Sequence, residues 1–195
     1  MAEPARTSPL AALARAERGV AGPAPVTLAA LPFRGKLIVR GDEKARARAS
    51  TALGWELPGA LRSASGGSVE ALWLGPDEWL VLVGADEADR TASALREALS
   101  GLDHAVVDVS DRFVGISVEG EHARDVLNAG VPLDPHPRAF PPGMVARTVL
   151  AKAPVVLRRP AERELFELYL NVSLAPYAWL FLENAAREFG FGIAR

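Results

Sequence analysis

The alternation of apolar and polar positions divides the middle of the chain into two strands and a helix. Apolar residues dominate 69–74 and 79–83, and the Gly-Pro-Asp-Glu segment between them (75–78) is typical of a hairpin turn. Four apolar residues then recur at helical spacing: Ala88, Ala92, Leu95 and Leu99. We expect Asp86 to cap this helix and Gly101 to end it.

The chain before this hairpin has weaker signals. Residues 1–30 are rich in Ala and Pro, which indicates an arm rather than a folded element, and folded structure is expected to begin at Phe33. A strand is predicted over 35–40 and a helix over 43–53. The Gly/Ser-rich segment 63–68 is expected to be a flexible loop.

The second half of the chain continues the mixed pattern. Five more strands are expected at residues 105–109, 113–119, 145–150, 155–158 and 165–170. A helix over 121–129 and a proline-rich loop over 131–143 separate the second of these strands from the third. A final helix is expected to start at Ser173 and stop at Gly190. Four of its residues are expected to face the core: Leu174, Tyr177, Phe181 and Ala185. An ion pair between Glu183 and Arg187 is expected on its outer side.

The resulting order is β-α-β-β-α-β followed by β-α-β-β-β-α. Hairpins adjoin helices, so the pattern favours an α+β fold rather than a doubly wound parallel sheet. We therefore expect two related split-βαβ (ferredoxin-like) lobes, about 31–110 and 111–195, that form one domain after the arm of residues 1–30.

The charge balance limits the classes of partner. The net charge is −2 and the pI is near 6.0, which argues against nucleic acid as the main partner. The basic run 44–48 is best interpreted as an exposed helix face. The chain has no cysteine, and no apolar run is long enough to span a bilayer. We expect a cytoplasmic protein without membrane contact.

A search for catalytic motifs gives mainly negative results. His104, His122 and His136 fall in different elements, so no local metal motif is present. Asp108 and Asp111 flank a strand end, where Asp108 is expected to anchor the turn and Asp111 to face water. Trp73 and Trp79 could form an aromatic pocket, but core packing is the favoured interpretation.

The proline-rich loop is the most unusual segment. Its prolines fix extended backbone, so the loop could hold Arg138 and Phe140 outward at little entropic cost. An aromatic residue beside an arginine on a rigid loop is typical of an interface anchor. A purely structural connector is the alternative.

Several segments resemble the gamma subunit family of hetero-tetrameric sarcosine oxidase. They are Ser-Pro-Leu at 8–10, Leu-Trp-Leu-Gly-Pro-Asp-Glu-Trp-Leu at 72–80, Val-Asp-Val-Ser-Asp at 107–111, the proline-rich segment 132–143 and Ala-Arg-Glu-Phe-Gly at 186–190. The resemblance covers almost the whole chain, and the proline-rich segment makes it specific.

The part from about Val106 onward also resembles, more distantly, the glycine-cleavage T-protein, a folate-dependent aminomethyltransferase. That family has an α+β fold with ferredoxin-like lobes and a catalytic aspartate in a Gly-Gly-x-x-Asp-Asp segment. The corresponding hairpin here reads Lys-Ala-Pro-Val-Val-Leu at 152–157, and no Asp or Glu occurs from 144 to 161. The resemblance therefore implies a related fold without T-protein catalysis.

The family resemblance implies a non-catalytic subunit. It implies alpha, beta and delta subunits as partners, in a complex that demethylates sarcosine oxidatively to glycine and passes the one-carbon unit to tetrahydrofolate. FAD, FMN, NAD and tetrahydrofolate are then expected in the other subunits, and no cofactor in this chain. Contacts with partners are expected at Leu10, Asp134, His136, Arg138 and Phe140, and the last helix is a further candidate.

A second hypothesis is a module that binds folate or another one-carbon carrier by itself. Trp79, Asp108 and Arg112 are then the candidate pocket residues.

Overall fold

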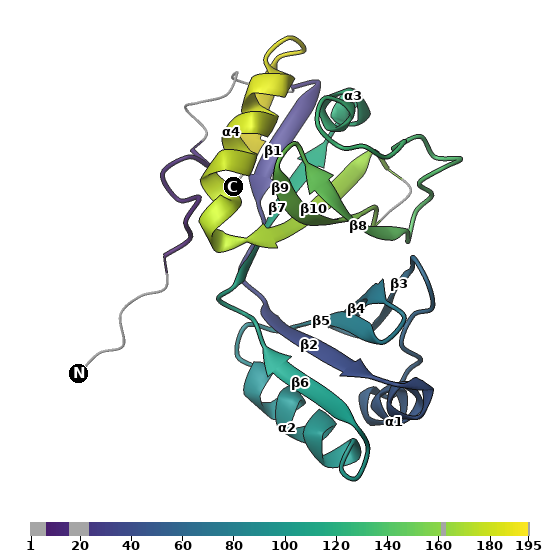
Figure 1. The fold of residues 1–195 in the computed structure, drawn as a ribbon. Helices are drawn as coiled ribbons and strands as arrows, with labels where there is room; N and C mark the ends of the chain where they lie inside the picture. Colours follow the sequence, from purple (N-terminus) through teal and green to yellow (C-terminus); the bar gives the residue numbers. More distant parts are fainter. Residues whose placement is uncertain (1–6, 16–23, 161–162, 195) are drawn as a thin grey trace, which may run out of the picture.

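The computed structural model describes residues 7–15, 24–160 and 163–194, which form two β-sheets with helices on their outer sides (Figure 1). The larger sheet has the strand order β11-β1-β7-β10-β9-β8. Its strands are β1 (Val26–Ala30), β7 (Phe113–Glu119), β8 (Val145–Leu150), β9 (Ala153–Arg158), β10 (Leu165–Asn171) and β11 (Phe191–Ala194). Helices α3 (Ala123–Asn128) and α4 (Ala175–Ala186) cover its outer face.

The smaller sheet has the order β3-β4-β5-β2-β6. Its strands are β2 (Gly35–Gly41), β3 (Ser63–Gly66), β4 (Val69–Gly75), β5 (Glu78–Val83) and β6 (His104–Asp108). Helices α1 (Glu43–Leu53) and α2 (Ala88–Ala98) pack on its outer face. Without β3, this is the strand order of a ferredoxin-like unit, so the α+β fold with two split-βαβ lobes is confirmed.

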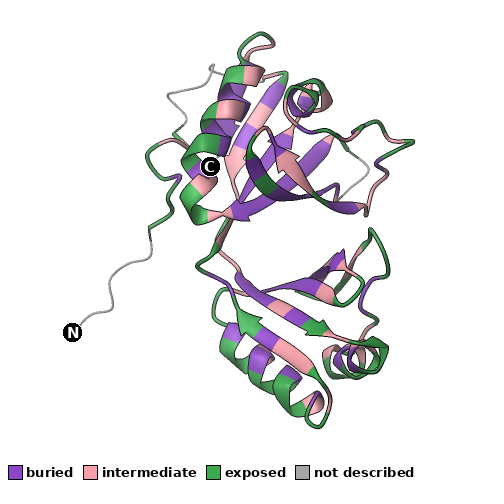
Figure 2. Ribbon diagram, viewed as in Figure 1, coloured by how far each residue is buried: buried purple, intermediate pink, exposed green. Residues whose placement is uncertain are grey.

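Three apolar clusters follow from the period-two alternation of the strands. Along β5, Trp79 and Val81 face α1 and α2, whereas Leu80 and Leu82 face the other sheet. Along β10, Phe166 and Leu168 face α4, whereas Tyr169 points between the sheets. Each sheet is therefore buried on both faces near its centre (Figure 2).

The N-terminal region departs from the expected arm. Residues 26–30 form β1, which pairs antiparallel with β7 and parallel with β11 in the middle of the larger sheet. Folded structure thus begins before Phe33, and that expectation was wrong. Strand β11, which follows Gly190 at a φ of 78°, was also missed. The division into one domain with two lobes stays a prediction.

Three local predictions also fail. Residues 63–66 form strand β3 instead of a flexible loop, because they pair with β4 from Ser63 opposite Leu72 to Gly66 opposite Val69. Asp86 does not cap α2, which begins after Glu87. Ser173 does not cap α4, because residues 172–174 form a short 3-10 turn before that helix.

The buried face of α4 is also rotated from the predicted one. Its buried residues are Ala175, Ala178, Trp179, Leu182, Glu183 and Ala186. Tyr177 is instead 40% exposed, and Phe181 and Ala185 are only partly buried. Glu183 pairs with Arg187 as expected, at 3.5 Å, but its side chain is buried rather than on the outer side.

Candidate functional site

The proline-rich loop presents only some of its predicted contact residues to solvent. Asp134, His136 and Arg138 are exposed, and two short side-chain contacts shape the turn. The Asp134 carboxylate accepts a hydrogen bond from the His136 amide at 2.9 Å, and His136 Nδ1 accepts one from the Arg138 amide at 3.2 Å. These three residues therefore stay available for a partner.

Phe140 and Leu10 occupy a different environment from the one expected. Phe140 is 1% exposed and packs beside Phe166, with ring centroids 6.4 Å apart. Leu10 is fully buried in the same cluster, below a turn in which the Ala14 amide donates to the Leu10 carbonyl at 2.7 Å. Both side chains belong to the chain's own core, so the expectation that Phe140 points outward was wrong.

The three candidate folate residues do not come together. Trp79 is buried on the helix side of the smaller sheet, where its indole N–H donates to the Pro58 carbonyl at 2.9 Å. The Asp108 carboxylate anchors the turn after β6 by accepting from the Ser110 amide at 2.8 Å. Arg112 donates to the Asn171 side chain at 3.1 Å. Trp73, like Trp79, packs in the core, as favoured from the sequence.

Arg112 does line a small cavity between the two sheets. Tyr169, Asn171, Glu78 and Arg147 contribute other polar groups to its wall, and its volume is about 160 Å³. Sites for drug-sized ligands usually have volumes of about 300–1,000 Å³. The residues around Arg112 therefore do not match a folate-sized ligand.

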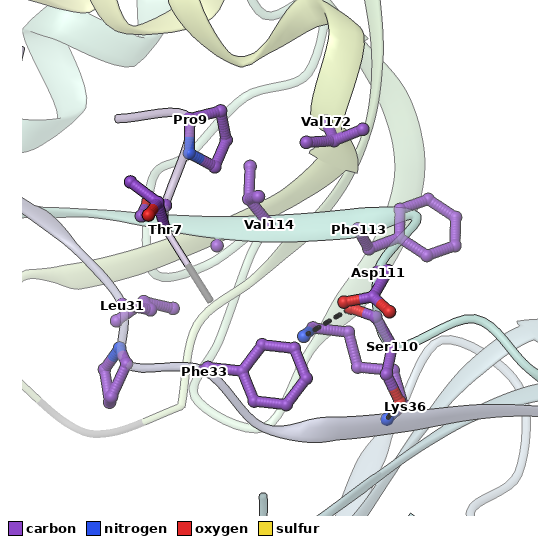
Figure 3. Close-up of a pocket in the computed structure, with 13 residues that line it drawn as sticks. Thr7, Pro9, Leu31, Phe33, Lys36, Ser110, Asp111, Phe113, Val114 and Val172 are labelled. Carbon is purple, nitrogen blue, oxygen red and sulfur yellow. Dashed lines mark hydrogen bonds between the residues drawn. The ribbon is translucent and has the colours of Figure 1, made fainter. Parts of the chain in front are cut away.

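A second cavity, of about 240 Å³, lies where the two sheets meet the N-terminal segment (Figure 3). Its walls are largely apolar and include Phe33, Val114 and Val172. Lys36 lies at its edge, is only 3% exposed, and donates from Nζ to the carbonyls of Arg34 at 2.8 Å and Ser110 at 3.4 Å. The ammonium group also lies 4.7 Å from the Phe33 ring centroid, a cation–π distance.

An ion-pair network joins the two sheets. Glu70 of β4 pairs with both Arg34 and Arg158 of β9. Arg158 also donates to Glu167 at 2.7 Å, and the Tyr169 hydroxyl donates to the same carboxylate at 2.8 Å. Arg158 is 5% exposed and Glu167 is 9% exposed, so most of the network is removed from water.

The network shifts the pKa values of its members. Burial alone would raise the pKa of Glu70, but the charges of Arg158 and Arg34 hold this pKa below its usual value. Burial raises the pKa of Tyr169, and the neighbouring Glu167 and Glu70 raise it further. Burial acts against the charged form of Arg158, yet the surrounding acidic groups hold its pKa above the ordinary value. The geometry therefore favours a structural ion network over a site for proton transfer.

The side chains of the described residues do not form the ligand set of a metal site. Within residues 7–15, 24–160 and 163–194, no group of three or more His, Cys, Asp or Glu side chains could hold an ion. The same part of the chain contains no helix that could span a membrane.

Known proteins similar to this chain identify its family. The family model described as "Sarcosine oxidase, gamma subunit family" matches residues 40–188. The chain belongs to this family.

Individual relatives in the family match nearly the full length. The gamma subunit of sarcosine oxidase from Corynebacterium sp. (strain U-96) is 33% identical over 190 residues, covering 94% of this chain and 91% of the relative. The corresponding subunit from Arthrobacter sp. is 34% identical over 167 residues, covering 84% and 81%. A chain of the heterotetrameric sarcosine oxidase from Corynebacterium sp. U-96 superimposes with a TM-score of 0.85 at 33% identity, covering 94% of this chain and 96% of that one.

The distant aminomethyltransferase likeness is also found. An aminomethyltransferase from Herpetosiphon aurantiacus is 30% identical over 147 residues, which cover 73% of this chain but only 40% of the relative. The glycine-cleavage aminomethyltransferase from Bartonella henselae has a TM-score of 0.63 at 18% identity, covering 82% and 45%, which shows a shared fold. In this chain, the β8–β9 hairpin turns at Ala151 and Lys152.

Proposed function

We propose that the chain is a non-catalytic gamma subunit that supports assembly of a heterotetrameric sarcosine oxidase. The observation that carries the proposal is the match to a chain of such an enzyme over 94% of this chain and 96% of that one. A subunit that matches over nearly its full length has the elements needed to occupy the same place in a complex. The alpha, beta and delta subunits are then the partners.

The absence of an acidic group from the β8–β9 hairpin supports a non-catalytic role. Residues 144–161 contain no Asp or Glu, so this segment has no carboxylate for the acid–base work expected of the T-protein family. The largely buried ion network between the sheets stabilises the fold and does not face a cavity of folate size. We infer that sarcosine oxidation, transfer of the one-carbon unit to tetrahydrofolate and binding of FAD, FMN and NAD belong to the other subunits. We also infer a cytoplasmic location, in agreement with the absence of cysteine from the sequence.

Co-expression tests the assembly role. The tagged chain is produced with the other three subunits, and co-purification, flavin absorbance and sarcosine-dependent peroxide formation are measured. We expect a yellow, active complex that assembles poorly when this chain is omitted. A complex that is equally assembled and active without the chain would exclude the assembly role.

Folate titration of the isolated chain by calorimetry tests the second hypothesis. We expect no binding at micromolar concentration, because the cavity beside Arg112 is small. Micromolar binding would instead favour the folate-binding module.

A further inference from the structure

The outward side of α4 is apolar where most surface helices are charged. Val172, Tyr177 and Leu180 are 37%, 40% and 46% exposed, and they are three of the five large hydrophobic residues that are exposed in the described part of the chain. Pro176 and Asn184 of α4 are also exposed, whereas Val172 lies in the 3-10 turn just before the helix. We call these five residues the α4 outer face. It forms an outer surface of the larger sheet's lobe (Figures 1 and 2).

The composition of this segment strengthens the observation. Residues 172–184 contain no Asp, Lys, Arg or His and only one Glu, Glu183, whose side chain is turned inward and is 3% exposed. A helix that is apolar on all sides is normally buried, in a large core or in a membrane. The 12 residues of α4 span only about 18 Å, well short of a bilayer's hydrocarbon core. This helix is therefore too short to be buried by crossing a membrane.

The α4 outer face continues into the cavity next to Lys36. Val172 belongs to both, and Pro9, Phe33 and Val114 extend the apolar surface inward from it (Figure 3). An apolar face beside a cavity of about 240 Å³ can accept a surface that carries a projecting side chain. Anchors of this kind, seated in a pocket and surrounded by contacts that exclude water, dominate the binding energy of many protein interfaces.

We propose that an apolar, uncharged surface of another oxidase subunit covers the α4 outer face and inserts a side chain into the cavity at Val172. This inference rests on the proposed function, since it names the surface through which the subunit assembles. The absence of charged residues from the α4 outer face indicates which kind of surface can bind there. None of the five residues of the α4 outer face is charged, so a charged surface would lose hydration over them without compensation, whereas an apolar surface gains by burial.

Leu180→Glu places a charge at the centre of the face without disturbing the core. Leu61→Glu is the matched control, because Leu61 is similarly exposed, at 42%, and lies in the segment before β3 in the other lobe. Each tagged variant is co-expressed with the other three subunits, the recovered partner is quantified, and thermal unfolding of the isolated variant checks its fold. We expect Leu180→Glu to weaken co-purification about tenfold or more, with Leu61→Glu close to wild type.

The outcomes separate the two proposals. If wild type and Leu180→Glu both co-purify fully, the docking inference is wrong and the assembly role stands. If wild type does not co-purify, both are wrong. If the isolated wild-type chain dimerises by light scattering and Leu180→Glu abolishes the dimer without affecting recovery of the other subunits, a second copy covers the face and the inference is overturned. Val114→Phe, which narrows the cavity, provides a second variant and should also reduce recovery.

Discussion

Arg158 forms ion pairs with acidic residues of both sheets. Its guanidinium group, 5% exposed, bridges Glu70 on the smaller sheet and Glu167 on the larger one. Buried charges are tolerated when partners offset the loss of hydration, so the network is stable only as a set. Removing one side chain of the network leaves its former partners buried without the opposite charge that compensates for their lost hydration.

Arg158→Met should therefore destabilise the chain strongly. We expect a loss of about 3–5 kcal/mol in the free energy of unfolding, measured by urea denaturation, because Glu167 is left in a buried position without its guanidinium partner. Arg40→Met removes an ion pair with Asp77 in which both side chains are about half exposed, and it should change stability little. Equal effects of the two variants would contradict this account of the network.

The same network predicts how stability depends on pH. The pKa of Glu70 is lowered in the folded chain by Arg158 and Arg34, which outweigh burial. Its contribution is therefore present above the unfolded-state pKa of about 4.3, and it is lost as the pH falls through the lower folded-state value. We expect the wild-type free energy of unfolding to fall more steeply with acid in this window than that of Glu70→Gln. If the free energy of unfolding fell equally steeply with acid in both proteins, Glu70 would not contribute to the loss of stability at low pH.

At the scale of elements, the proline-rich loop combines a core function with an exposed surface. Phe140 anchors the loop beside Phe166, while Asp134, His136 and Arg138 face solvent. Arg159, whose guanidinium donates to the Phe140 carbonyl at 3.4 Å, ties the loop to the end of β9. A loop held this way keeps its exposed residues in a fixed arrangement.

Phe140→Ala should test this anchoring. Removing a buried phenylalanine typically costs about 3–5 kcal/mol of stability, and we expect a loss in this range by chemical denaturation. Arg138→Ala, in the same loop, should leave stability almost unchanged because the side chain is exposed. A near-neutral Phe140→Ala would mean that the loop packs by other contacts.

The elements differ in how well the sequence predicts them. The β4–β5 hairpin and α2 were predicted because their apolar periods are local and clear. The buried side of α4 was missed because residues 172–184 are apolar almost all round, so periodicity cannot distinguish the two sides. Strands β1 and β11 pair with partners far away in the sequence, and each has only four or five residues to signal it.

The candidate site was predicted less completely than the fold. Exposure of Asp134, His136 and Arg138 agrees with their polar character, whereas Phe140 in the same loop carried no sign of its inward packing. The sequence does indicate the α4 outer face, because residues 172–184 include only one Asp, Glu, Lys, Arg or His. The prediction that Tyr177 faces the core prevented this interpretation. The sequence of residues 172–184 predicts an apolar helix, but the packing of that helix on the sheet determines which of its sides is exposed to solvent.

At the scale of the whole molecule, the two sheets share an inner core. Leu72, Leu80 and Leu82 from the smaller sheet pack with Val145 and Val156 from the larger one, and the Arg158 network lies in the same layer. Strand β1 precedes the smaller sheet in the chain yet pairs in the larger one. The chain thus crosses between the two sheets through the linkers after β1 and after β6. The smaller sheet is built from the continuous segment 35–108, which is inserted between β1 and β7 of the larger sheet.

These features predict that the two sheets unfold as one unit. Separating them would expose the inner core and leave the Arg158 network unpaired, so an intermediate with one intact sheet should be poorly populated. Native-state hydrogen exchange measures this at increasing denaturant: the most protected amides of β5 and β10 should converge on one free energy of opening. Leu82→Ala weakens the shared core and should lower the free energies of opening of β5 and β10 together. Leu95 packs only between α2 and the smaller sheet, so Leu95→Ala tests whether a cavity in that outer core also lowers the protection of β10. If β10 kept its protection in Leu95→Ala while β5 lost it, the sheets would be separate cooperative units, and the single-domain prediction would be replaced by two domains joined at residues 31–34 and 109–112.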